Sequence, residues 1–250
     1  MANPFFQFKK FIVHQQHTSM KVCTDACLFG AWVAQKELTS KSTTILDIGT
    51  GTGLLSLMLA QVTEQSKAKI SAVEIEQHAA SEASSNFNLS PWKDRIRVFN
   101  DSIQNFTKGI ITSNEQVDKT FDLIITNPPF FEGDLKSPDI NKNKAAHSTE
   151  LPWSVLIENV SNLLSDTGSF FVLVPTLRAY TMQKLAESNQ MYLAEEVLVY
   201  NDAKHLPFRA MLQFKKTKEN VVRNKIVIKE GENNYSSAFT NLLAAYYLYL

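Results

Sequence analysis

The chain has 250 residues, of which 44% are hydrophobic and 10% aromatic, and its 25 Lys and Arg balance 25 Asp and Glu. This composition supports a sizeable core and excludes a globally disordered chain. The longest apolar run is shorter than the roughly 20 residues of a membrane span, and the N-terminus lacks a signal-peptide layout. The two cysteines, Cys23 and Cys27, cannot form a disulfide framework. We therefore expect a cytoplasmic protein without membrane contact.

The first predicted element is a strand that runs into a glycine turn. Thr44 to Ile48 is rich in β-branched and apolar residues, and Gly49, Gly51 and Gly53 follow it. The next segment, Leu54 to Ala60, is rich in helix formers. A glycine turn between a strand and a helix allows the backbone to approach a ligand closely.

The residues around this turn restrict the ligand. The sixth position counted from Gly49 is Leu54, so the dinucleotide pattern G-x-G-x-x-G fails, and no Lys-Ser/Thr pair follows that would make a phosphate-binding loop. Asp47 stands two residues before the first glycine, where its carboxylate would repel a pyrophosphate. The turn therefore suits a cationic ligand, such as one with an ammonium and a sulfonium group.

Three further predicted strands each lead to a polar residue at a regular interval. The strands are Lys69 to Ile75, Ile96 to Phe99 and Phe121 to Thr126; Glu74 follows Asp47 by 27 residues, Asp101 follows Glu74 by 27, and Asn127 follows Asp101 by 26. Such steps match successive β-α units of about 30 residues. The carboxyl ends of parallel strands share one edge of a sheet, where such folds bind their ligands. An acid at the end of the second strand can accept hydrogen bonds from both hydroxyls of a ribose.

The motif Asn127-Pro128-Pro129-Phe130 carries the predicted chemistry. The prolines fix the backbone and remove two N–H donors, which leaves the Asn127 side-chain oxygen and the Pro128 carbonyl as acceptors. Two acceptors can hold an exocyclic amine with its lone pair toward an incoming methyl group, and Phe130 offers a plane on which a flipped base can stack. The alternative is a rigid turn that ends a strand.

The rest of the chain continues the α/β pattern without a linker, so we predict one domain over residues 1–250. Phe131 to Glu150 lacks a clear period and is interpreted as a loop over the site. The predicted elements are a helix at Leu151 to Ser165, a strand at Ser169 to Val174, a final antiparallel pair at Val197 to Tyr200 and Ala210 to Phe214, and a helix at Ser237 to Leu250 with Phe239, Leu242, Leu243 and Tyr246 facing inward.

Charge is segregated along the chain although its sum is zero. Residues 1–41 carry a net +3, residues 42–203 a net −8, residues 204–229 a net +7 and residues 230–250 a net −2. Such segregation can create a positive face for nucleic acid on a neutral molecule. The alternative is a solvated, lysine-rich edge that limits aggregation.

Several motifs resemble those of known families. The sequence D-x-G-x-G-x-G at Asp47 resembles motif I of the class I S-adenosylmethionine (SAM) methyltransferases, and N-P-P-F resembles motif IV of the amino-methyltransferases. Over almost its whole length, the chain is similar to the bacterial tRNA1(Val) adenine-37 N6-methyltransferase family. The segments that carry this similarity are Phe8 to Phe11, Met20 to Trp32, Ser90 to Trp92, Leu206 to Arg209 and Asn234 to Thr240.

This resemblance implies a Rossmann-like α/β fold, with a seven-stranded, mostly parallel sheet, a C-terminal antiparallel strand pair, helices on both faces, and an N-terminal extension, residues 1–41, over the cofactor. It also implies SAM-dependent methylation of the adenine beside the anticodon of a valine tRNA. The implied catalytic residues are Asn127, Pro128 and Phe130; the implied cofactor-binding residues are Asp25, Asp47, Gly49, Thr50, Gly51, Glu74, Ile75, Asp101, Ser102 and Asn127.

The predicted RNA contacts are Lys9, Lys10, Lys144, Lys204, Arg209, Lys215, Lys216 and Lys218. One departure from the family is Ala146, at the position of an expected Arg, which Lys142 or Lys144 could replace. We expect a monomer without a metal. RNA guanine-N2 methylation, protein glutamine-N5 methylation, and a SAM-binding RNA-associated module without catalysis remain as alternatives.

Overall fold

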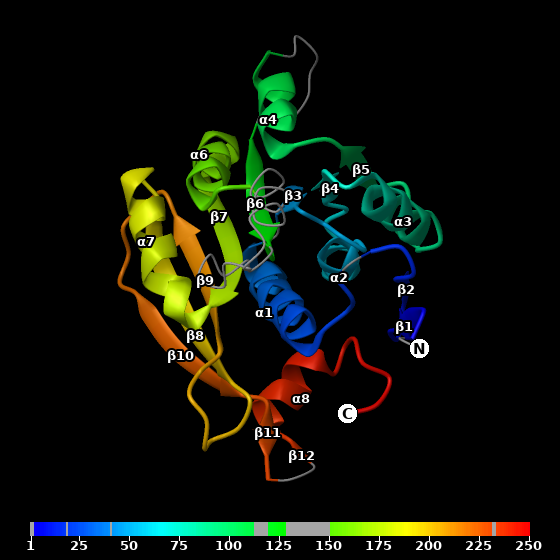
Figure 1. The fold of residues 1–250 in the computed structure, drawn as a ribbon, viewed down its shortest axis with the longest axis vertical. Helices are drawn as coiled ribbons and strands as arrows, with labels where there is room; N and C mark the ends of the chain where they lie inside the picture. The colour runs from blue at the N-terminus through cyan, green and yellow to red at the C-terminus, as the bar shows by residue number, and fades with distance from the viewer. Residues whose placement is uncertain (1–2, 19, 41, 113–119, 129–150, 232–233) are drawn as a thin grey trace, which may run out of the picture.

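The computed structural model describes residues 3–18, 20–40, 42–112, 120–128, 151–231 and 234–250. Its centre is an eight-stranded sheet in the order β10-β8-β9-β7-β6-β3-β4-β5 (Figure 1). The strands are β3 (Thr44–Ile48), β4 (Lys69–Glu74), β5 (Ile96–Asn100), β6 (Phe121–Thr126), β7 (Leu164–Pro175), β8 (Tyr192–Tyr200), β9 (Arg209–Lys215) and β10 (Val222–Val227). Strands β3 to β7 run parallel, whereas β9 is antiparallel to both β7 and β8.

Helices cover both faces of this sheet, as the sequence predicts. They are α1 (Thr24–Ser40), α2 (Leu54–Val62), α3 (Gln77–Asn88), α4 (Ile103–Thr112), α6 (Trp153–Leu163), α7 (Ala179–Ser188) and α8 (Ser237–Leu243), with a short 3-10 helix, η1 (Thr176–Arg178). Successive residues of β7 divide between two apolar clusters, with Phe171 beside α1 and α2 and Phe170 beside α6 and α7. This alternation confirms a strand that is buried on both faces.

The predicted count of seven strands is wrong, because β10 adds an eighth strand parallel to β8. Only Ile226 is fully buried in β10, so the strand lacks the alternation of apolar and polar residues that would have identified it. The antiparallel pair β8 and β9 is confirmed, and β8 and β7 begin five residues earlier than predicted, at Tyr192 and Leu164.

The predicted C-terminal helix is also too long. Helix α8 ends at Leu243, and the chain then turns so that Tyr247 forms an isolated bridge with Phe8. Phe239, Leu243 and Tyr246 are buried as predicted. The last residues therefore pack against the N-terminal segment rather than continuing the helix.

A small hairpin precedes α1 and lies beside the C-terminal residues (Figure 1). It consists of β1 (Phe5–Gln7) and β2 (Ile12–His14), and a second small pair, β11 (Lys229–Glu230) and β12 (Asn234–Tyr235), follows β10. The rings of Phe8 and Phe11 stack with their centroids 4.5 Å apart. In the described part of the chain, every helix is too short or too polar to cross a bilayer.

Candidate active site

The predicted site residues meet at the carboxyl edge of the parallel strands. Ile48, at the end of β3, is in register with Val73 of β4 on one side and Thr126 of β6 on the other. The glycine turn therefore lies between Glu74 and Asn127, which follow those two partners in sequence. The regular spacing in the sequence predicted this juxtaposition.

Two of the three turn glycines lie beside open space. Gly49, Gly51 and Gly53 have φ values of +69°, +56° and +84°, a region that disfavours residues with a side chain. A Cβ added at Gly49 or Gly51 would meet no atom within 4 Å, whereas one at Gly53 would lie 2.4 Å from the Phe87 ring. The first two positions thus leave room for a ligand, and the third serves packing between the turn and α3.

Asp47 lies beneath the turn, with a side chain that has no exposed surface. Its Oδ2 accepts hydrogen bonds from Thr50 Oγ1 at 2.6 Å and Ser56 Oγ at 2.7 Å, and its Oδ1 is buried without a hydrogen-bond partner among the described residues. Burial raises the pKa of this carboxyl to about 6. The carboxylate therefore holds the turn to α2, a role that the motif alone did not predict.

Glu74 connects the end of β4 to the glycine turn. Its Oε2 accepts a hydrogen bond from the Gly51 N–H at 2.9 Å, and its Oε1 accepts one from the Glu76 N–H at 2.9 Å. A carboxylate oxygen has more than one lone pair, so further donors such as ribose hydroxyls can still bind. The next residue, Ile75, is 66% exposed and offers an apolar surface beside this carboxylate.

Asp101 and Ser102 directly precede α4 and lie beside Glu74. The Asp101 N–H donates to the Glu74 carbonyl at 3.1 Å, which places the two strand ends together. Asp101 Oδ1 accepts from the Ser102 N–H at 2.7 Å and from Asn105 Nδ2 at 3.1 Å. The pair therefore stabilises the first turn of the helix at the predicted edge.

Asn127 presents an unpaired acceptor at the same edge. Its Oδ1 is buried and has no hydrogen-bond partner among the described residues, and its Nδ2 lies 3.9 Å from Met20 Sδ. Leaving a buried acceptor unsatisfied costs about 1–3 kcal/mol, so this oxygen has the capacity to accept a hydrogen bond beyond those of the described residues. Pro128 is buried, whereas Pro129, Phe130 and the predicted loop of residues 131–150 lie outside the described residues.

Helix α3 anchors the N-terminal segment through two residues that the sequence analysis missed. Asn86 Nδ2 donates to the carbonyls of His14 and Thr52, both at 2.9 Å, which links β2 to the glycine turn. Glu82 accepts hydrogen bonds from three consecutive backbone N–H groups, those of residues 16–18, at 2.5–3.2 Å. Their only signal in the sequence is a polar residue on an otherwise packed helix face.

Two residues predicted for different ligands pair with each other. Arg209 Nε donates to Asp25 Oδ2 at 2.8 Å, between the start of β9 and the start of α1. Asp25 was predicted to bind the cofactor and Arg209 to bind RNA. The ion pair fastens the N-terminal end of α1 to the carboxyl edge of the sheet.

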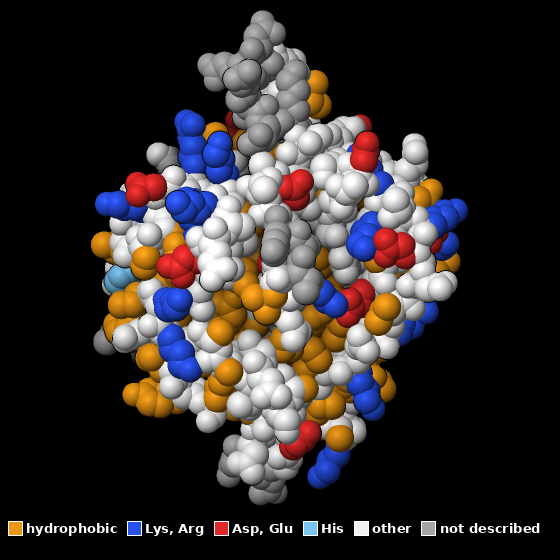
Figure 2. Space-filling model, turned by 180° about the vertical axis from the view of Figure 1, so that it is seen from behind, with side chains coloured by type: hydrophobic (Ala, Val, Ile, Leu, Met, Phe, Trp, Pro, Cys, Tyr) orange, Lys and Arg blue, Asp and Glu red, His pale blue; other side chains and the backbone are white. Residues whose placement is uncertain are grey.

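The other predicted RNA contacts are dispersed. Lys9 Nζ donates to the Ala244 carbonyl, and Lys10 lies 3.3 Å from a Glu64 carboxylate oxygen. Lys204 lies in the loop between β8 and β9, and Lys144 lies outside the described residues. On the face shown in Figure 2, basic side chains are spread around the periphery among acidic ones, while hydrophobic side chains gather toward the middle.

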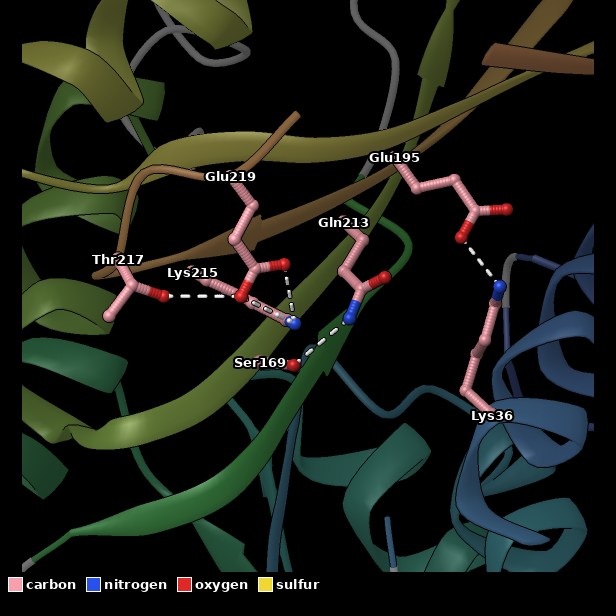
Figure 3. A network of polar contacts seen from close by, with 7 residues as sticks. All are labelled: Lys36, Ser169, Glu195, Gln213, Lys215, Thr217 and Glu219. Carbon is pink, nitrogen blue, oxygen red and sulfur yellow. Dashed lines mark hydrogen bonds and ion pairs between the residues drawn. The ribbon is translucent and has the colours of Figure 1, made fainter. Parts of the chain in front are cut away.

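The lysines that follow β9 lie at the opposite edge of the sheet. Because β9 runs antiparallel to β7, Lys215 is in register with Ser169 near the start of the parallel strands. Lys215 pairs with Glu219 at 2.9 Å within a polar network (Figure 3). Lys216 lies 3.4 Å from Asp166, and Lys218 Nζ lies 4.6 Å from the centre of the Tyr192 ring.

Comparison with known proteins gives a consistent result. Residues 29–191 match the model of the methyltransferase small domain. The chain is 37% identical to the tRNA1(Val) (adenine(37)-N6)-methyltransferase of Bacteroides fragilis strain YCH46, over 99% of both chains, and 38% identical to that of Cytophaga hutchinsonii, over 100% of both.

Solved structures agree on the fold. A predicted O-methyltransferase from Agrobacterium tumefaciens superimposes with a TM-score of 0.65 at 17% identity, covering 88% of this chain and 96% of the other. A putative RNA methyltransferase from Pyrococcus horikoshii gives 0.53 at 16% identity, covering 78% and 83%. The chain therefore belongs to the methyltransferase small-domain family, in the group of the tRNA1(Val) (adenine(37)-N6)-methyltransferases.

Proposed function

We propose that the chain transfers a methyl group from SAM to N6 of adenine 37 in tRNA1(Val), giving N6-methyladenosine and S-adenosylhomocysteine. The observation that carries this proposal is the buried Asn127 Oδ1 beside the glycine turn, which has no hydrogen-bond partner in the part of the chain that the structure describes. Near full-length relatives at 37–38% identity bear the name of this activity. Because the proposed substrate is a tRNA, we place the activity in the cytoplasm. We also propose a monomer, because one chain supplies every residue that the proposed reaction uses.

The residues at the carboxyl edge fit SAM. The space over Gly49 and Gly51 admits the methionine part, and the buried Asp47 Oδ1 offers an unpaired acceptor beneath it. Glu74 can accept the ribose hydroxyls, and exposed Ile75 can cover one face of the adenine ring. When bound, SAM supplies a methyl group made electrophilic by its sulfonium sulfur.

Asn127 and Pro128 orient the acceptor amine. One N–H of the amine donates to Asn127 Oδ1 and the other to the Pro128 carbonyl. This geometry turns the nitrogen lone pair away from both acceptors and toward the methyl group. A bond forms between N6 and the methyl carbon while the sulfur–carbon bond breaks, and the amine then releases a proton to water. Alignment of the reacting atoms contributes much of the rate, so no strongly basic side chain is required. Stacking of the base on Phe130 remains a prediction.

The test is nucleoside analysis of tRNA that lacks the modification after incubation with the protein and SAM. N6-methyladenosine at position 37 is expected. N2-methylguanosine instead, or methylation of a protein glutamine, would contradict the proposal, and no transfer at all would favour a SAM-binding module without catalysis. In Asn127→Ala we expect SAM still to bind while methyl transfer falls by at least about a hundredfold. Full activity in this variant would refute the acceptor role of Asn127.

A further inference from the structure

Two strands extend beyond Asn127 at the carboxyl edge. Thr126, the last residue of β6, is in register with Val172, whereas β7 continues to Pro175. At about 3.3 Å per residue, β7 projects roughly 10 Å past the end of β6. Arg209 of β9 pairs with Pro175 and begins at the same height. These strand ends form a wall on one side of the acceptor oxygen.

The top of this wall carries two solvent-exposed leucines from segments far apart in sequence. Leu177 in η1 is 94% exposed, and Leu206 in the loop between β8 and β9 is 87% exposed. The two segments are joined by a hydrogen bond from the Thr176 N–H to the Phe208 carbonyl at 3.3 Å. Isolated exposed leucines are ordinary, but two from joined segments at the carboxyl edge that carries Asn127 indicate a contact surface.

The residues around these leucines suit a polyanion with exposed apolar surface. Arg178 and Lys204 lie beside Leu177 and Leu206 in sequence, and Asp202 is paired with His205 at 2.7 Å. Arg209, whose guanidinium is paired with Asp25 at 2.8 Å, lies 5.4 Å from the centre of the Phe208 ring. Cations around an apolar tip match a nucleic-acid loop, in which phosphates surround stacked bases.

We propose that Leu177 and Leu206 form a wedge that fills the place vacated by adenine 37 when this base leaves the anticodon-loop stack. The proposal rests on the proposed function. A base amine can reach Asn127 only after the base is extruded, and extrusion uncovers the faces of the neighbouring bases. Apolar side chains inserted at such a step replace part of the lost stacking. The leucines thereby act as positioning residues, since they touch the neighbours of the reacting base.

The test uses an anticodon stem-loop of tRNA1(Val) with the fluorescent base 2-aminopurine at position 37, together with the full-length protein and S-adenosylhomocysteine. In wild type, we expect fluorescence to rise on binding because 2-aminopurine brightens when it leaves the stack. In the double variant Leu177→Ala/Leu206→Ala, we expect most of this rise to be lost and the kcat/KM for tRNA to fall about tenfold, which corresponds to about 1.4 kcal/mol. Binding of SAM should stay unchanged.

Leu89→Ala is the matched control, because Leu89 is also solvent-exposed, at 72%, but caps the C-terminal end of α3. It should leave fluorescence and rate as in wild type. A double variant with the wild-type fluorescence rise and rate would overturn the wedge while leaving the proposed function intact. A wild-type protein that does not methylate adenine 37 would overturn the proposed function itself. Equal losses in the double variant and in Leu89→Ala would also refute the wedge.

Discussion

Alanine substitutions at the turn glycines should affect ligand binding and folding stability to different extents. All three have positive φ, so an alanine at any of them costs about 1–2 kcal/mol of folding free energy through backbone strain alone. At Gly51 the new methyl group would project into open space, whereas at Gly53 it would lie 2.4 Å from the Phe87 ring. In Gly51→Ala the free energy of folding should therefore change only by the backbone strain. In Gly53→Ala overpacking should destabilise the protein by about 1–3 kcal/mol more.

These costs predict different outcomes in two measurements. In thermal unfolding, about 1 kcal/mol corresponds to roughly 2–4 °C for a chain of this size, so we expect Tm to fall by about 2–8 °C for Gly51→Ala and by about 4–20 °C for Gly53→Ala. In calorimetric titration with SAM, we expect at least about a tenfold loss of affinity for Gly51→Ala. Folded Gly53→Ala should stay within about threefold of wild type.

One pattern of results would refute this reasoning. If Gly51→Ala bound SAM as tightly as wild type while Gly53→Ala did not, the open space over the turn would not be the cofactor site. Equal losses of stability in the two variants would show that the contact with Phe87 does not control packing at Gly53.

Three further predictions concern other parts of the molecule. Burial raises the pKa of Asp47 from 3.8 to about 6, so the native state binds this proton more tightly than the unfolded state, and the free energy of unfolding falls as the pH rises between these two values. In urea unfolding this fall should be about 3 kcal/mol in wild type and absent in Asp47→Asn. An unchanged pH profile in the variant would contradict the burial argument. Glu82→Gln should lower the free energy of unfolding by about 2 kcal/mol, because a charged acceptor of three N–H groups is replaced by an amide. The N-terminal segment of this variant should also become more sensitive to limited proteolysis. Resistance equal to that of wild type would refute the anchoring role. Neutralising Lys215, Lys216 and Lys218 should weaken tRNA binding and flatten its salt dependence; an unchanged slope would show that these paired lysines are only a solvated edge.

The sequence predicted the part of the fold that repeats. Asp47 lies near the end of β3, Glu74 ends β4 and Asn127 follows β6, and the spacing of these apolar strands indicated that the three residues share one edge of a sheet. Apolar strands of this kind carry a strong local signal. Strand β10 carries none, because four of its six residues are exposed and its place depends on pairing with β8.

The sequence predicted which residues surround the site better than what each one does. The acidic residue of the glycine motif suggested a direct ligand contact, which stays a prediction, and burial with two hydroxyl partners shows that Asp47 also supports the turn. Lys215 contributed to a basic run in the sequence, and its RNA contact stays a prediction; the structure adds that β9 carries it to the edge opposite Asn127 and that Glu219 pairs with it. Both outcomes depend on tertiary contacts that no local pattern records.

The contact between the two ends of the chain also constrains how the protein folds during synthesis. The hydrogen bond from Lys9 Nζ to the Ala244 carbonyl joins residues 235 positions apart, and ribosomes add about 5–20 residues per second. The apolar surface of Phe8, which packs against Tyr247, therefore waits roughly ten to fifty seconds until this partner has been synthesised. The N-terminal hairpin cannot take its final place until the residues around Ala244 have been synthesised, so the layer that packs beside the glycine turn closes late.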